Sequence, residues 1–269
     1  MTAFDAARPD GMIRLMSDAL HVHSYGPVDS PPLLMLHGVC GHGARFRRLA
    51  ETLLRGYHVI APDLRGHGLS DRLPPWTLEQ HAADLLRVLD SRGLDKTTVV
   101  GHSYGGLVAL HLAHLAPRRV GRLVLLDPAV NVKPEQALEY AQTAEVIRAD
   151  RGEALATQRH DWPGEPEEHI EEEVAANWVE VDGTWRPRYS PAAVITAWSE
   201  MCRAPVLPLP GLPTLLVEAT REAFVGPDFV KACKFALGDE FRHVGLDLGH
   251  MLYLEDPAAT AELIDGFAR

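Results

Sequence analysis

The stretch that decides the fold reads Thr97-Thr98-Val99-Val100-Gly101-His102-Ser103-Tyr104-Gly105-Gly106-Leu107. Its centre has the pattern G-x-S-x-G, which by composition alone arises in about one unrelated chain of this length in ten. Its position is more specific, because a short apolar run precedes it and an apolar helical run begins at Leu107. Such a tight turn from a strand into a helix strains the serine backbone, and the flanking glycines leave room for it. We therefore expect Ser103 to project at the carboxyl edge of a sheet as a candidate nucleophile, above a helix N-terminus that favours negative charge.

Short apolar runs alternate with amphipathic stretches of helical length along the chain, which predicts a parallel sheet covered by helices. A hairpin of Ile13–Met16 and Leu20–Tyr25 is expected at the sheet edge. The strands expected after it are Pro32–His37, Tyr57–Ala61, Thr97–Val100, Leu123–Leu126, Thr214–Val217 and Phe241–Leu248. The expected helices include Leu78–Leu89, Leu107–Leu115 and Ala258–Phe267. Counting both strands of the hairpin, the pattern predicts an α/β protein with a mostly parallel, eight-stranded sheet.

The alternation stops between about residues 131 and 210, where no clean strand is visible. This segment holds 15 acidic and 7 basic residues and four of the five tryptophans. We interpret it as a helical cap over one end of the sheet, in which the Glu165–Glu173 run is a solvated face. The predicted organisation is therefore a core made of residues 1–130 and 211–269, with residues 131–210 as the cap.

Charge and composition exclude several classes of protein. The net charge of −11 disfavours binding to nucleic acid and to anionic membrane surfaces. No stretch is apolar and long enough to span a membrane, and no secretory signal is visible. Three scattered cysteines suit neither a disulfide framework nor a zinc site and fit a cytoplasmic protein. None of the 14 histidines lies in a metal-ligand pattern, so neither a metal nor another cofactor is expected.

A serine nucleophile needs a base and an oxyanion site. His250 follows the last predicted strand, so it should emerge at the same sheet edge as Ser103 and is the candidate base. The developing oxyanion needs hydrogen-bond donors. The backbone N–H groups of Tyr104, at the helix start, and of Val39, after the early strand, are the natural candidates.

Together these residues resemble the α/β-hydrolase fold enzymes over nearly the whole chain. The motifs that carry the resemblance are His37-Gly38, Asp63-Leu64-Arg65-Gly66-His67-Gly68, Gly101 to Gly105, and Gly249-His250 followed by Leu254-Glu255-Asp256-Pro257. The resemblance implies an eight-stranded sheet with a cap after the sixth strand. It also implies that Ser103 is the nucleophile, His250 the base, and Val39 and Tyr104 the oxyanion donors. Relatives that act as epoxide hydrolases or dehalogenases use an aspartate nucleophile, so Ser103 argues against both activities.

The acid of the triad is left open by the sequence. The family usually places an aspartate after the seventh strand, but the position in register here is Glu222. The nearby Asp228 is expected to begin the next helix. Some relatives carry the acid at the end of the sixth strand, where this chain has Asp127, and Glu218 is a third candidate.

The resulting functional expectation is a serine hydrolase that cleaves a neutral or apolar carboxylic ester through an acyl-enzyme intermediate. Lactone hydrolysis and C–C bond cleavage use the same residues and remain alternatives, with aminopeptidase action and perhydrolysis as lesser ones. The alternative from another class is a non-catalytic receptor that captures a small ligand on a hydrolase scaffold. The sequence leaves the oligomeric state open.

Overall fold

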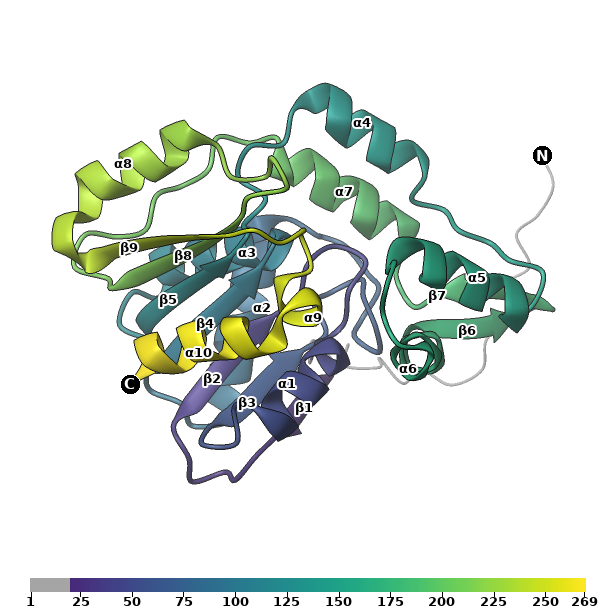
Figure 1. Ribbon diagram of the computed structural model, residues 1–269, viewed down its shortest axis with the longest axis horizontal. Coiled ribbons are helices and arrows are strands. Elements are labelled where there is room, and N and C mark those ends of the chain that lie inside the picture. Colours follow the sequence, from purple (N-terminus) through teal and green to yellow (C-terminus); the bar gives the residue numbers. More distant parts are fainter. Residues whose placement is uncertain (1–19) are drawn as a thin grey trace, which may run out of the picture.

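The computed structural model describes residues 20–269, and its centre is a seven-stranded sheet (Figure 1). The first strand runs antiparallel to its neighbour, and every other pair of neighbouring strands is parallel. In spatial order the strands are β1 (Val22–Tyr25), β3 (His58–Pro62), β2 (Pro32–Leu36), β4 (Thr97–His102), β5 (Val120–Leu126), β8 (Thr214–Ala219) and β9 (Phe241–Leu246).

The sheet is buried on both faces because its strands are apolar without alternation. On β2, Leu34 and Leu36 face one core, while Leu33 and Met35 face the other. The first core is closed by α2 (Leu78–Ser91), α3 (Tyr104–Leu115) and α8 (Pro227–Leu237). The second is closed by the short helices η1 (Gly43–Phe46), α1 (Arg47–Thr52) and α9 (Leu252–Glu255) and by the longer α10 (Pro257–Ala268). A further short turn, η2 (Gly238–Glu240), leads into β9.

The expected eight-stranded count is not confirmed. All six runs predicted after the hairpin form strands, and Leu20–Tyr25 contributes β1 at the sheet edge. The other predicted hairpin strand, Ile13–Met16, lies outside the described residues. Over residues 20–269 the sheet therefore has seven strands, with β1 as its antiparallel edge.

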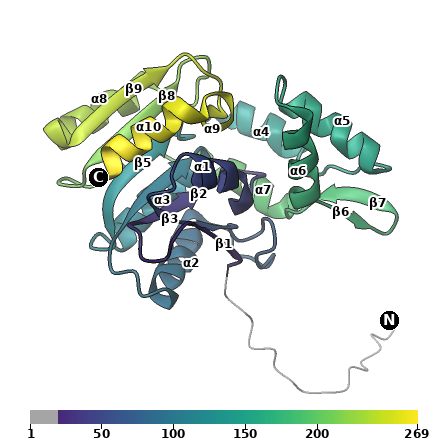
Figure 2. The ribbon, with the colours of Figure 1, turned by 60° about the horizontal axis from the view of Figure 1, so that its bottom comes forward.

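The segment between β5 and β8 contains both helices and strands. It comprises α4 (Pro134–Gln142), α5 (Arg151–Asp161), α6 (Glu167–Asn177), β6 (Trp178–Val181), β7 (Thr184–Pro187) and α7 (Pro191–Met201). Figures 1 and 2 show α5, α6, β6 and β7 side by side, away from the sheet, with α4 and α7 nearer to it. We call residues 131–210 the insertion.

The expectation of a strand-free insertion is wrong, because β6 and β7 form an antiparallel hairpin. Asp182 and Gly183 connect the two strands, with φ angles of 51° and 75°. Asp-Gly with both φ angles positive is the preferred two-residue hairpin turn. That signal is present in the sequence, with Trp178, Val179 and Val181 before it and Thr184 and Trp185 after it.

Two further features bear on the expected class of protein. Within residues 20–269, no helix has the length and apolar character that crossing a membrane requires. Cys40, Cys202 and Cys233 are all free thiols.

Candidate active site

Ser103 occupies a strained turn between β4 and α3. Its backbone has φ 55° and ψ −122°, a conformation normally reserved for glycine. The turn is held because the Ser103 N–H donates to the carbonyl of Leu126, at 3.0 Å. It also needs glycine on both sides: a Cβ on Gly101 would lie 2.4 Å from the Gly105 carbonyl oxygen, and one on Gly105 would lie 2.5 Å from that of Leu36. The turn therefore brings α3 directly against the strands and places the buried Ser103 hydroxyl at the carboxyl edge of the sheet.

His250 lies beside that hydroxyl. It follows β9 and precedes α9, and its Nε2 is 2.8 Å from Ser103 Oγ. The backbone of this loop is held by His102, whose Nε2 is 2.8 Å from the His250 carbonyl oxygen and donates to it. The ring of Phe224 lies 4.3 Å from the imidazole ring, centre to centre. His250 is thus oriented by neighbours on both sides to accept a proton from Ser103.

Asp127 meets the other nitrogen of the same imidazole. Its Oδ2 is 2.6 Å from Nδ1 of His250, and its Oδ1 accepts a hydrogen bond from the Ala219 N–H at 3.1 Å. The residue is fully buried and directly follows β5, in a left-handed conformation with φ 40°. The carboxylate makes Nδ1 the protonated nitrogen, which leaves Nε2 free to accept the serine proton.

The expected position of Glu222 next to the imidazole is corrected by this geometry. The Glu222 carboxylate interacts with the backbone N–H of His250 rather than with its ring. The carboxylate that meets Nδ1 is that of Asp127, directly after β5. Glu218, the third candidate, pairs with His243 at 2.7 Å. Asp228 is exposed at the start of α8, as expected.

Burial sets the protonation of the pair. Desolvation lowers the pKa of His250 to about 4. Desolvation raises the pKa of Asp127 to about 6, against the opposing effect of the bond from the Ala219 N–H. At neutral pH the imidazole is therefore neutral and the carboxylate ionised, which is the combination that a general base requires.

The two expected oxyanion donors flank Ser103. The turn that carries Val39 packs directly on Ser103, because a Cβ on Gly38 would lie 3.0 Å from the Ser103 Cβ. His37 holds this turn: its Nδ1–H donates to the Gly38 carbonyl at 2.7 Å, and its Nε2 accepts from the Leu64 N–H at 2.9 Å. Among the bonds of residues 20–269, the N–H groups of Val39 and Tyr104 have no protein acceptor. Both amides are therefore available to a ligand.

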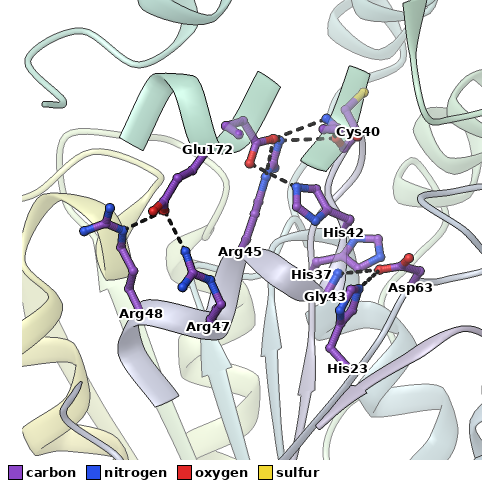
Figure 3. A network of polar contacts seen from close by, with 12 residues as sticks. His23, His37, Cys40, His42, Gly43, Arg45, Arg47, Arg48, Asp63 and Glu172 are labelled. Carbon is purple, nitrogen blue, oxygen red and sulfur yellow. Dashed lines mark hydrogen bonds and ion pairs between the residues drawn. The ribbon is translucent and has the colours of Figure 1, made fainter. Parts of the chain in front are cut away.

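One group of possible metal ligands forms where none was expected. In the described part of the chain, His21, His23 and Asp63 bring their ligand atoms within 4.8 Å of one another. Asp63 is already engaged: Oδ1 accepts from the Gly43 N–H at 2.7 Å and meets His23 Nε2 at 3.1 Å, and Oδ2 accepts from the Leu69 N–H at 2.9 Å. These bonds make Asp63 a brace between β1, η1 and its own loop (Figure 3). The sequence could not reveal this group because Asp63 lies 40 residues from His23.

A cavity of about 650 Å³ lies between the turn that carries Val39 and the insertion. From that turn it is lined by Cys40, the residue after Val39. Aromatic side chains from the insertion line much of it, together with charged groups such as Arg148 and Asp161; the aromatic residues are Tyr140, Trp162, Trp178 and Tyr189. A small organic molecule of mixed polarity would fit this space.

Comparison with known proteins agrees with this architecture. A model of the α/β hydrolase fold matches residues 31–161. Lipase LipV of Mycobacterium tuberculosis is 36% identical over 264 residues, which cover 91% of this chain and 96% of the lipase. Esterase YbfF of Escherichia coli is 26% identical, over 88% of this chain and 92% of that protein.

Solved structures show the same fold at lower identity. The structure of E-2-(acetamidomethylene)succinate hydrolase superposes with a TM-score of 0.80 at 23% identity, over 92% of this chain and 94% of that one. A marine microorganism esterase has a TM-score of 0.76 at 20% identity, over 93% of this chain and 99% of its own. At these identities the likeness concerns the arrangement of helices and strands.

Proposed function

Because the chain belongs to the α/β-hydrolase fold family, we propose that it is a serine hydrolase that cleaves carboxylic esters through an acyl-enzyme intermediate. The observation that carries the proposal is the continuous line of contacts from Ser103 Oγ to His250 Nε2, at 2.8 Å, and from His250 Nδ1 to Asp127 Oδ2, at 2.6 Å. Ser103 is then the nucleophile, His250 the base and Asp127 the acid of a triad.

In the acylation half of the reaction, His250 Nε2 takes the hydroxyl proton as Ser103 Oγ bonds to the ester carbonyl carbon. The carbonyl oxygen becomes an oxyanion and accepts hydrogen bonds from the N–H groups of Val39 and Tyr104. When the tetrahedral intermediate collapses, the C–O bond to the alcohol breaks and the leaving oxygen takes the proton from Nε2. The ionised Asp127 stabilises the imidazolium between these two transfers.

In the deacylation half, a water molecule attacks the acyl carbon while His250 Nε2 takes one of its protons. The second tetrahedral intermediate then expels Ser103 Oγ, which recovers that proton, and the carboxylic acid leaves. The same groups therefore act twice, and no cofactor takes part in the proposed steps.

We propose that residues 131–210 act as a cap and that the cavity beneath it receives the substrate. Its aromatic lining suits a neutral or apolar ester of modest size, as expected from the acidic insertion. The relatives named lipase and esterase support ester cleavage as the reaction class. Lactone and C–C bond hydrolysis remain alternatives on the same residues.

A fluorophosphonate probe combined with ester turnover tests the proposal. The wild-type protein should be labelled on Ser103 and should hydrolyse short p-nitrophenyl esters over many cycles. Ser103→Ala should lose labelling and should lower kcat by several powers of ten, because it removes the nucleophile. Labelling without sustained turnover would instead favour the receptor alternative, and activity near the wild-type level in Ser103→Ala would refute the mechanism.

A further inference from the structure

The acidic run on α6 is solvated at Glu167 and Glu168 but not over its whole length. Glu173 is buried, with only 3% of its side chain exposed, and pairs with Arg45 of η1. Its neighbour Glu172 meets Arg47 and Arg48 of α1 at 2.9 and 3.0 Å. Figure 3 shows these arginines reaching from the core toward α6. The expectation of a solvated face is therefore wrong at Glu173, whereas Glu172 is partly exposed.

Arg45, Glu173, His42 and Asn177 form one buried group, which we call the Arg45 cluster. Glu173 Oε1 accepts two charge-assisted hydrogen bonds from Arg45, one from Nε at 3.0 Å and one from Nη2 at 2.7 Å. Oε2 of Glu173 lies 3.0 Å from His42 Nε2, and Asn177 Nδ2 donates to Oε1 at 3.2 Å. Burial alone would raise the pKa of Glu173, but Arg45 and His42 lower it to about 2. The Glu173 carboxylate is therefore ionised, and each of its two oxygens has at least one hydrogen-bond partner.

A buried ion pair of this kind has little value for stability as such. The cost of removing both charges from water nearly cancels their attraction, so apolar residues of similar volume serve stability about as well. Such a pair can nevertheless position the groups that it binds, because a charged pair with three or more directed hydrogen bonds allows only one arrangement. The Arg45 cluster can therefore hold a neighbouring segment of the chain in one position.

The Arg45 cluster holds the turn that carries Val39. Arg45 Nη2 donates to the Cys40 carbonyl at 3.3 Å, and Asn177 Nδ2 reaches the same oxygen at 3.4 Å. Cys40 immediately follows Val39 and has φ 61°, a strained value for a residue with a side chain. The Cys40–Gly41 peptide is thus held partly from the insertion. The Val39 N–H lies two peptide units earlier in the same turn, which the Gly41 N–H closes by donating to the Gly38 carbonyl at 3.1 Å.

Arg45 also lies near the segment that follows the base. The guanidinium interacts electrostatically with Tyr253, whose ring packs edge-on against His102 at 5.1 Å. His102 in turn donates to the carbonyl of His250. The guanidinium carbon Cζ also lies over the Trp162 ring of the insertion, 5.2 Å from its centre. Arg45 therefore interacts with the insertion, with the Val39 turn and with the surroundings of His250.

We propose that Arg45 and Glu173 are positioning residues for the oxyanion site: through the Cys40 carbonyl they hold the Val39 N–H in the orientation that receives the oxyanion. The inference rests on the proposed function. Its consequence is that the contact between α6 and the core affects kcat, whereas a contact that only shaped the substrate cavity would affect KM.

The test compares Glu173→Gln with Glu172→Gln as a matched control on the same helix. Glu173→Gln removes the charge and weakens the bonds to Arg45, so kcat for p-nitrophenyl acetate should fall about 10- to 100-fold, less than the full loss of one oxyanion donor. KM should stay within about twofold, because the aromatic lining of the cavity is unchanged. In Glu172→Gln, which alters only partly exposed ion pairs, both constants should remain near wild type.

A second variant separates positioning from folding. Arg45→Met/Glu173→Met replaces the buried pair by apolar side chains, so its unfolding free energy should stay close to wild type while kcat remains low. Hydrogen exchange supplies a readout that does not depend on activity: amides of residues 37–46 should exchange faster in Glu173→Gln and in the double variant than in Glu172→Gln.

Three results would overturn the proposal: unchanged exchange of residues 37–46 in both Glu173 variants, wild-type kcat in the double variant, or a rise of KM at constant kcat. Failure of the proposed function looks different, because the wild-type protein would then neither react with the fluorophosphonate nor hydrolyse the ester. In that case the exchange experiment still decides whether the Arg45 cluster holds the Val39 turn.

Discussion

Nδ1 of His250 lies 2.6 Å from Oδ2 of Asp127, a residue 123 positions earlier in the chain. Asp127 ends β5, and His250 follows β9, with β8 between these strands in the sheet. The Asp127 carboxylate therefore reaches the imidazole across the carboxyl end of β8 and takes the Ala219 N–H of that strand as its second partner. Glu222, in the loop after β8, interacts with the backbone of His250, whereas Phe224 of the same loop packs against the imidazole ring.

Replacing each of the two candidate acids by its amide should separate their roles. Asp127→Asn is expected to lower kcat by about 10³- to 10⁴-fold, because an amide no longer holds the reactive tautomer or stabilises the imidazolium. Glu222→Gln should change kcat less than about fivefold, since its carboxylate does not meet the ring. Ester kinetics at pH 8 measure both, and a larger loss in Glu222→Gln than in Asp127→Asn would contradict this assignment.

The pH profile of kcat/KM should have a single acidic limb. Activity needs a neutral imidazole and an ionised carboxylate, and both are lost as the pH falls. Burial lowers the pKa of His250 to about 4 and raises that of Asp127 to about 6. Because activity needs both conditions, the higher of the two values sets the midpoint of the limb, which should lie near pH 6, below the value of about 6.5 for a free imidazole. Initial rates from pH 4 to 9 test this expectation, which a midpoint of 7 or above would contradict.

The strained backbone of Ser103 should be measurable as a difference in stability between two inactive variants. Ser103→Gly and Ser103→Ala both remove the hydroxyl, but only glycine accepts φ 55° with ψ −122° at little cost. Relief of about 1–3 kcal/mol of strain, less the greater chain entropy of glycine, should make Ser103→Gly about 1 kcal/mol more stable than Ser103→Ala. Urea unfolding measures the difference, and equal stabilities would mean that the turn stores no strain.

A methyl group at Gly105 should be strongly destabilising. Its Cβ would lie 2.5 Å from the Leu36 carbonyl oxygen and 2.6 Å from that of His37, and neither backbone group can move without displacing β2 or the turn after it. Gly105→Ala is expected to lower the unfolding free energy by at least about 2 kcal/mol. Gly56→Ala is the matched control, because nothing lies within 4 Å of its added Cβ. A loss of similar size in both variants would point to a general effect of the substitution.

Much of the core could be predicted from local patterns. The central strands are apolar without alternation, and a buried parallel sheet is the usual outcome of such runs. The placement of Ser103 and His250 at one sheet edge follows from the rule that all parallel strands end on the same side. The β6–β7 hairpin could also be predicted, since Asp182-Gly183 is a strong turn signal. The acidic composition of the insertion obscured that signal.

The choice of acid could not be made in the same way. Asp127, Glu218 and Glu222 all lie near the correct sheet edge, and a shift of one turn changes which of them meets the imidazole. Glu173 is a similar case: in sequence it resembles its exposed neighbours, and only the position of Arg45 on η1 makes it a buried partner. Both outcomes depend on distances between segments more than 80 residues apart.

The amino-acid sequence by itself determined the class of fold and the pair Ser103 and His250, because strand runs, a glycine-flanked turn and the order of segments are local properties. Tertiary structure alone decided that Asp127 contacts the imidazole and that α6 is tied to the turn after β2. The physical reason is that a hydrogen bond or ion pair forms within about 3 Å, and the chain's local pattern does not specify the distance between remote side chains at that scale.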